Sequence, residues 1–251
     1  MNMGQQQVIR SVRATLLIAS VALVAGCGGG GGGGSSPSSM SMISVAGTAA
    51  TGKALANATI SINCVQGSIS VAADANGNYH ATLGAVTPCM IEATSGVTML
   101  HSVAFAGGTF NVTPETDLLL SYLAAQLGTN ESGLIASFAV NTPFQQVLEN
   151  QADILTAQTA VFQNLQQTDG VTLSTVNFLT TSFAVGQPGE DSDLEALLAR
   201  GVIDADGEPD AAAVALMATT GAAHPLATSP GTSSGTGGTG VGGTGSPGGM
   251  M

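Results

Sequence analysis

Basic and aromatic residues are scarce in this sequence. It has 4 Lys and Arg residues against 16 Asp and Glu, only 2 Tyr and no Trp in 251 residues. A surface so short of positive charge repels phosphate groups, because nucleic-acid binding depends on Lys and Arg side chains that displace counterions. We therefore expect no nucleic-acid partner, and the missing Trp disfavours sugar recognition through aromatic stacking.

Sequence signatures of common catalytic sites are also missing. No GxSxG elbow lies between a strand and a helix, no SxxK motif is present, and no GxGxxG or P-loop pattern follows a strand. Each of these motifs positions a nucleophile or a phosphate group through a particular backbone shape. We predict no catalytic residue, no cofactor and no enzymatic activity, with an undetected hydrolase as the least favoured alternative.

The first 27 residues have the layout of a signal peptide. Arg10 and Arg13 precede an apolar run over residues 14–25. As a helix this run would span roughly 18 Å, against about 30 Å of membrane hydrocarbon, which is short for a permanent anchor. We expect residues 1–26 to be removed. Later apolar runs are only a few residues long, so no membrane-spanning helix is expected in the mature chain.

The leader ends in Val24-Ala25-Gly26-Cys27. This resembles the lipobox of bacterial lipoproteins, and the resemblance implies that Cys27 carries acyl chains such as palmitate, which would hold the protein to a membrane. Glycine follows the cysteine where lipoproteins kept at the inner membrane of diderm bacteria have aspartate. By that similarity we expect the outer membrane, on its periplasmic or surface face. The alternative is an ordinary secretory leader with an incidental cysteine.

Two low-complexity segments flank the rest of the chain. Residues 27–40 join the predicted lipidated cysteine to a Gly/Ser run, and residues 221–251 are mostly Gly, Ser, Thr and Pro. Such segments cannot bury side chains, so we expect a flexible tether and a disordered tail. Without its leader the chain keeps 2 basic residues, Lys53 and Arg200, against 16 acidic ones, a formal net charge of −14.

Residues 41–112 alternate between apolar and polar side chains with the period of a β-strand. The apolar face of the first clear strand holds Ala58, Ile60, Ile62 and Cys64. Asn76-Gly77 has the signature of a two-residue hairpin turn before a returning strand. Several short strands separated by Gly-rich turns predict an antiparallel, immunoglobulin-like β-sandwich.

Turn glycines and a hairpin signature recur in this segment, as Gly47, Gly52-Lys53-Ala54-Leu55, Ala58-Thr59-Ile60 and Asp74-Ala75-Asn76-Gly77-Asn78-Tyr79. Together these motifs resemble the carboxypeptidase regulatory-like, transthyretin-like (prealbumin-like) β-sandwich. That module is usually an accessory or binding domain without catalytic residues of its own. The resemblance covers about a third of the chain and implies a fold more than a function.

Cys64 and Cys89 each fall at a position of their predicted strand whose side chain points to the buried face. Export would place them in an oxidising compartment, so we predict a disulfide between them. The alternative is two separately buried thiols. A metal site is disfavoured because no CxxC pair or neighbouring histidine supplies further ligands.

Helices are expected over residues 113–220, which makes the fold class α+β with a small helical domain after the sandwich. Thr113-Pro114-Glu115 predicts a helix start and Gly128 its stop. A longer helix is expected from Thr142-Pro143 to near Gly170. Its apolar stripe recurs every seven residues, so we expect an internal helical layer, with an intermolecular coiled coil as the alternative. Shorter helices are predicted over residues 193–200 and 210–220.

The two predicted halves meet with almost no linker at residues 111–117. We therefore expect the sheet and the helices to dock against each other.

Candidate metal ligands are acidic loops and isolated histidines. The loops that begin at Asp74 and at Asp204 open like calcium loops, but neither has glycine at the sixth position or glutamate at the twelfth. We expect a hairpin turn at the first, and a polar loop over residues 204–210 at the second, with a weak calcium site there as an alternative. A site formed by His80, His101 and Glu92 is conceivable but disfavoured, so no metal is predicted.

These observations favour a non-enzymatic cell-envelope lipoprotein that binds or scaffolds another envelope component through protein contacts. The alternative is a carbohydrate-binding or adhesive surface module.

Overall fold

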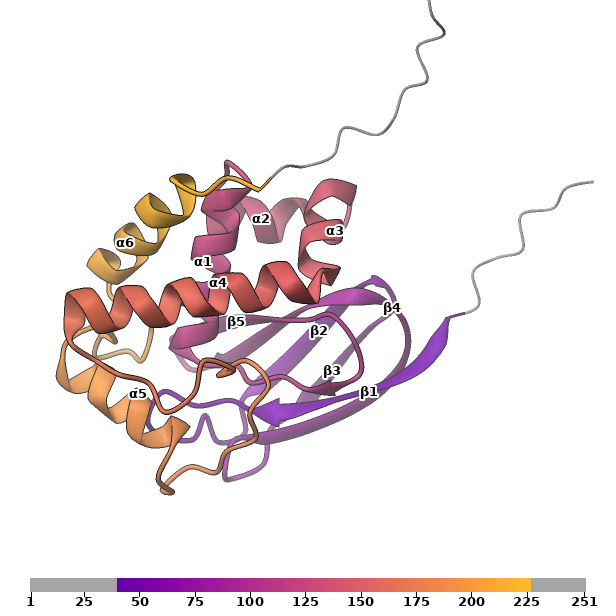
Figure 1. Cartoon of the computed structure of the whole chain (residues 1–251). Coiled ribbons are helices and arrows are strands. Elements are labelled where there is room, and N and C mark those ends of the chain that lie inside the picture. Colours follow the sequence, from indigo (N-terminus) through magenta and orange to yellow (C-terminus); the bar gives the residue numbers. More distant parts are fainter. Residues whose placement is uncertain (1–39, 227–251) are drawn as a thin grey trace, which may run out of the picture. The chain divides into compact units, whose positions relative to one another are not determined.

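The computed structural model describes residues 40–226 (Figure 1). The predicted signal peptide, Cys27, most of the tether and the tail beyond residue 226 lie outside the described residues. The strands are β1 (Ser41–Thr48), β2 (Thr59–Gln66), β3 (Ser68–Ala72), β4 (Asn78–Ser95), β5 (Thr98–Ala104) and β6 (Gly108–Thr109).

Six α-helices and one π-helical turn follow the strands in this part of the chain. They are α1 (Pro114–Gln126), α2 (Glu131–Ser137), α3 (Thr142–Glu149), α4 (Gln151–Asn164), η1 (Leu165–Asp169), α5 (Glu190–Ala199) and α6 (Ala211–Ala222). Strands followed by helices confirm the predicted α+β class. Across residues 40–226, every helix is too short or too polar to traverse a bilayer.

Strand β4 runs through the whole sheet, whose order is β3-β2-β4-β1-β6 with β5 also on β4. Its first part pairs with β1, and its second part pairs with β2 and β5. The predicted sandwich is not confirmed, because 18 consecutive residues of β4 join all the pairings into one open sheet. The sheet is also mixed, since β6 lies parallel to β1.

The predicted alternation of strand β2 is confirmed, with Ala58, Ile60 and Ile62 buried and Thr59 and Asn63 exposed. The predicted disulfide is present as well. Cys64 lies directly opposite Cys89 in the antiparallel pairing of β2 with β4, and their sulfur atoms are bonded. The disulfide therefore links two neighbouring strands at the buried face of the sheet.

The predicted hairpin at Asn76-Gly77 is wrong in its strand pairing. The turn exists, and Gly77 has a φ of +81°, but β3 before it pairs with β2 while β4 after it pairs with β1 and β2. The turn is closed locally instead, because the Asp74 carboxylate accepts hydrogen bonds from the backbone N–H groups of Asn76 and Asn78 at 2.8 and 2.9 Å. These bonds lower the pKa of Asp74.

Helix α1 lies at the centre of the packing, against β5, α4 and α6. The helix starts at the predicted place, where Thr113 forms a capping box with Thr116. The sequence predicts one apolar face, but every residue of α1 is buried. Its neighbours on several sides, rather than its own amphipathicity, therefore set its position.

The long helix predicted from Thr142 to near Gly170 is interrupted. Asn150 has an extended backbone (φ −80°, ψ 101°) that ends α3, and its side chain accepts a hydrogen bond from Ala152 N at 3.0 Å to start α4. The apolar stripe packs internally as predicted and includes Val147, Leu148, Ile154, Val161 and Leu165, all buried. An asparagine that caps a new helix explains the break.

The predicted docking of sheet and helices is present, since α1 packs against β5, and Asn111 at the junction is fully buried. Its side-chain amide donates hydrogen bonds to the carbonyls of Phe178 and Thr181 at 2.8 and 2.7 Å. Its side-chain oxygen accepts one from Thr48 N on β1 at 3.3 Å. One amide thus joins β1 to the irregular segment that precedes α5.

Candidate functional site

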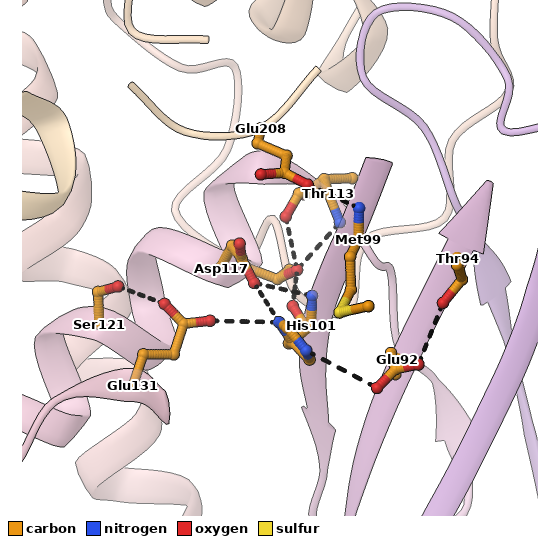
Figure 2. Close-up of polar contacts among 10 residues, drawn as sticks. Glu92, Thr94, Met99, His101, Thr113, Asp117, Ser121, Glu131 and Glu208 are labelled. Atoms are coloured by element: carbon orange, nitrogen blue, oxygen red, sulfur yellow. Dashed lines mark hydrogen bonds and ion pairs between the residues drawn. The ribbon is translucent and has the colours of Figure 1, made fainter. Parts of the chain in front are cut away.

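Four ionisable side chains from four elements surround the middle of β5 (Figure 2). His101 lies on β5 directly opposite Glu92 on β4. Asp117 comes from the first turn of α1, and Glu131 is the first residue of α2. The start of each helix favours an acidic residue because of the partial positive charge there.

The imidazole of His101 is the centre of this group, which we call the His101 cluster. Its Nδ1 lies 3.1 Å from Asp117 Oδ1 and 3.4 Å from Glu131 Oε1. Its Nε2 lies 3.9 Å from Glu92 Oε2. The side chains of His101, Asp117 and Glu131 are 15%, 11% and 19% exposed, whereas that of Glu92 is 38% exposed. Three carboxylates thus converge on one mostly buried ring.

Hydrogen bonds from neighbouring groups hold these side chains in place (Figure 2). Ser121 Oγ donates to Glu131 Oε2 at 2.6 Å, and Thr94 Oγ1 donates to Glu92 Oε1 at 3.1 Å. The backbone N–H of His101 donates to Asp117 Oδ1 at 2.8 Å. Each of the three carboxylates is therefore held by at least one hydrogen bond.

Burial and charge act in opposite directions on the His101 cluster. Burial lowers the pKa of His101, but hydrogen bonds and negative charge from Asp117 and Glu131 outweigh this effect and raise the pKa to about 10. Burial raises the pKa of Asp117 to about 8, although His101 opposes that shift. For Glu131, burial is outweighed by hydrogen bonds with His101, Asp117 and Ser121, so its pKa is lowered.

Only part of this site was predicted from the sequence. The candidate set of His80, His101 and Glu92 included two of its members, and Glu92 and His101 do lie side by side. Asp117 and Glu131 were not predicted as partners of His101, although the Asn130-Glu131 pair is a recognisable helix start. His80, the third predicted candidate, lies elsewhere on β4 with its Nε2 2.8 Å from Ser44 Oγ.

The His101 cluster combines an imidazole with carboxylates, which are ligand types of divalent cations. One potential ligand atom each from His101, Asp117 and Glu131 falls within 4.8 Å of the others. Beside them, a cavity of about 200 Å³ is lined by Ser121, Asn130, Glu131, Ser132, Val214 and Ala218. Of the three residues, Glu131 is the one that borders this cavity.

A second group of carboxyls lies near the start of α5. Glu115 and Glu190 are 0% and 2% exposed, and Asp193 is 8% exposed. Asp193 accepts hydrogen bonds from the backbone N–H and hydroxyl of Ser174 at 2.7 and 2.6 Å. Within residues 40–226, neither oxygen of Glu190 accepts a bond from an N–H or hydroxyl group. We call Glu115, Glu190 and Asp193 the buried acid group.

Protons must neutralise part of the buried acid group. Burial, with the charge of Asp193, raises the pKa of Glu115 to about 8. Burial, with the charges of Glu115 and Asp193, raises that of Glu190 to about 10. A hydrogen bond between the Glu115 and Glu190 carboxyls supports the proton on Glu190, since two carboxyls can bond to each other only when one is protonated.

The acidic loop over residues 204–210 connects α5 to α6. Asp204 Oδ1 accepts hydrogen bonds from the backbone N–H groups of Asp206 and Glu208 at 2.9 and 3.0 Å. Glu208 in turn accepts one from Met99 N at 2.8 Å. These carboxylates thus shape the loop and attach it to β5, as the polar-loop interpretation predicts.

No family model, curated protein or solved structure matches this chain. Its function must therefore be argued from its own residues.

Proposed function

We propose that this protein is an exported lipoprotein of the cell envelope, anchored through acyl chains on Cys27. Its body would act as a non-enzymatic binding or scaffolding module. Support for the anchor is the order of basic stretch, apolar run and Val24-Ala25-Gly26-Cys27. By similarity to other lipoproteins with Gly after the cysteine, we place it at the outer membrane.

The observation that carries this proposal is the disulfide between Cys64 and Cys89. Disulfides persist in exported proteins and are rare in the reducing cytosol. The sequence has 3 cysteines, so this disulfide leaves Cys27 as the one available for acylation. The use of all three cysteines agrees with export followed by lipid attachment.

The charge of the chain supports protein contacts as its mode of binding. Beyond the leader, the only basic residues are Lys53 and Arg200. An acidic surface attracts partner surfaces rich in Lys and Arg and raises the rate of their encounter. We therefore propose an envelope protein with a basic surface as the partner.

We also propose that residues 41–112 descend from the transthyretin-like module that their turn motifs resemble. The support is the set of motifs at Gly47, residues 52–55, residues 58–60 and residues 74–79.

Detergent phase partitioning tests the anchor. The parent protein should enter the detergent phase, and Cys27→Ala should move to the aqueous phase because no acyl chain is attached. Ser35→Ala, in the same Gly/Ser run, is the matched control and should partition like the parent. Equal partitioning of Cys27→Ala and parent would refute the lipid anchor.

Crosslinking in intact cells, followed by mass spectrometry, tests the binding role. We expect a recurrent envelope protein whose capture by the purified full chain weakens as salt is raised, since exposed charge pairs are screened. Binding to defined glycans on an array, with no protein captured, would instead favour the carbohydrate-binding alternative.

A further inference from the structure

We propose that His101, Asp117 and Glu131 bind one divalent transition-metal ion, with Zn²⁺ as the best match. This inference goes beyond the proposed anchor and scaffold role and does not depend on either. It starts from the convergence of the three side chains from β5, α1 and α2 (Figure 2).

The separations within the cluster match the spacing of zinc ligands. Zinc bonds of 2.0–2.2 Å to nitrogen and oxygen place neighbouring ligand atoms of a tetrahedron about 3.3–3.6 Å apart. His101 Nδ1 lies 3.1 Å from Asp117 Oδ1 and 3.4 Å from Glu131 Oε1. Both distances from Nδ1 are therefore within a few tenths of an ångström of the zinc-ligand spacing, and all three ligand atoms lie within 4.8 Å of one another.

The cluster also brings two carboxyl groups to one ring nitrogen. Nδ1 holds at most one hydrogen, yet two carboxylates approach this same nitrogen. Both hydrogen bonds that Asp117 accepts, from the backbone and the ring of His101, go to Oδ1. The Asp117 side chain is 11% exposed, and its carboxyl also contacts that of Glu131. A divalent cation could replace the hydrogens held between the ring and the two carboxyls and contact all three groups at once.

The surroundings of the cluster resemble the outer shell of a metal site. Metal-bound histidines usually direct the second ring nitrogen at a carboxylate, and metal-bound carboxylates are themselves hydrogen-bonded. Here Nε2 of His101 faces Glu92 at 3.9 Å, and Ser121 donates to the Glu131 oxygen that does not face His101. The Ser121 hydrogen bond leaves Glu131 Oε1 free to face His101 Nδ1, and Glu92 adds a negative charge on the far side of the ring.

The ligand set favours zinc over calcium. Calcium takes 6–8 oxygen ligands, whereas three protein ligands that include an imidazole suit zinc, with water in the fourth position. The cavity of about 200 Å³ that borders Ser121 and Glu131 has room for water molecules next to one of the three ligands.

Titration of the metal-stripped full chain, solubilised in detergent, with Zn²⁺ alone tests the proposal. Calorimetry against a competing chelator should give one ion per chain. Asp117→Asn and Glu131→Gln should each weaken the Kd by at least about 100-fold, and Glu92→Gln by about 10-fold. His80→Gln is the matched control, because His80 lies on the same sheet outside the cluster, and its Kd should equal that of the parent.

Nitrogen NMR of the parent protein provides a readout that needs no variant. Addition of Zn²⁺ should shift the His101 Nδ1 resonance and leave those of His80 unchanged. The proposal is overturned if binding does not saturate at one ion, or if the His101 resonances do not respond. It is equally overturned if His80→Gln weakens binding as much as Asp117→Asn does.

Discussion

Replacement of Glu190 by glutamine should stabilise this protein at neutral and alkaline pH. Glu190 is 2% exposed, and its pKa is raised from 4.5 to about 10 by burial and by the charges of Glu115 and Asp193. Between these two pH values the folded state holds a proton that the unfolded state releases. Because the folded state binds more protons, stability falls as the pH rises through this range.

The expected gain in the free energy of unfolding follows from the range of pH over which folded Glu190 keeps its proton. Each pH unit lowers the free energy of unfolding by about 1.4 kcal/mol per retained proton, or about 4 kcal/mol from pH 5 to pH 8. Glutamine has nearly the same shape and needs no proton. The hydrogen bond from glutamine to Glu115 is less favourable and costs about 1–2 kcal/mol. When this cost is subtracted, Glu190→Gln should be more stable than the parent by about 2–3 kcal/mol at pH 8.

Urea unfolding followed by circular dichroism at pH 5, 6, 7 and 8 measures this difference. At pH 5 the variant should be less stable than the parent by about 1–2 kcal/mol, because only the weaker hydrogen bond counts there, and the order should reverse as the pH rises. Glu195→Gln, an exposed position on the same helix, is the control and should follow the parent. A Glu190→Gln variant that is less stable than the parent at pH 8 would refute the reasoning, as would a constant difference across the pH range.

Two further predictions concern the sheet and its junction with the helices. Replacing both Cys64 and Cys89 by alanine should cost about 3 kcal/mol in urea unfolding, because the crosslink spans 25 residues; a cost below about 1 kcal/mol would contradict this. Asn111→Ala should cost about 3–5 kcal/mol, since it leaves buried carbonyl groups without donors. Asn63→Ala, exposed on β2, should change stability by less than about 0.5 kcal/mol; similar losses for both variants would count against the role of Asn111.

Features set by neighbouring residues were predictable from the sequence. The alternation around Ile60 defines which face of β2 is buried. Cys64 and Cys89 both fall on the buried faces of their predicted strands, which is why a disulfide between them was predicted. The start of α1 followed from Thr113-Pro114, because a capping residue and a proline act within one turn. The short helices α5 and α6 were also expected, although α5 begins at Glu190, three residues earlier than predicted.

Features set by distant residues were not predictable in this way. The continuity of β4 depends on strands β1, β2 and β5, which pair along different parts of it. The break at Asn150 replaces a helix that a seven-residue apolar repeat favours. The His101 cluster joins positions up to 39 residues apart in sequence, Glu92 and Glu131, and their approach depends on how α1 and α2 pack against β5.

The complete enclosure of α1 bears on how this protein could have evolved. A segment surrounded by both the sheet and the other helices cannot be exchanged between proteins without exposing its leucines. Separation of the chain at residue 113 would expose the leucines of α1 on one fragment and the part of β5 that they cover on the other. Sheet and helices are thus inherited together, and new binding properties would have to arise by substitution on the outer loops.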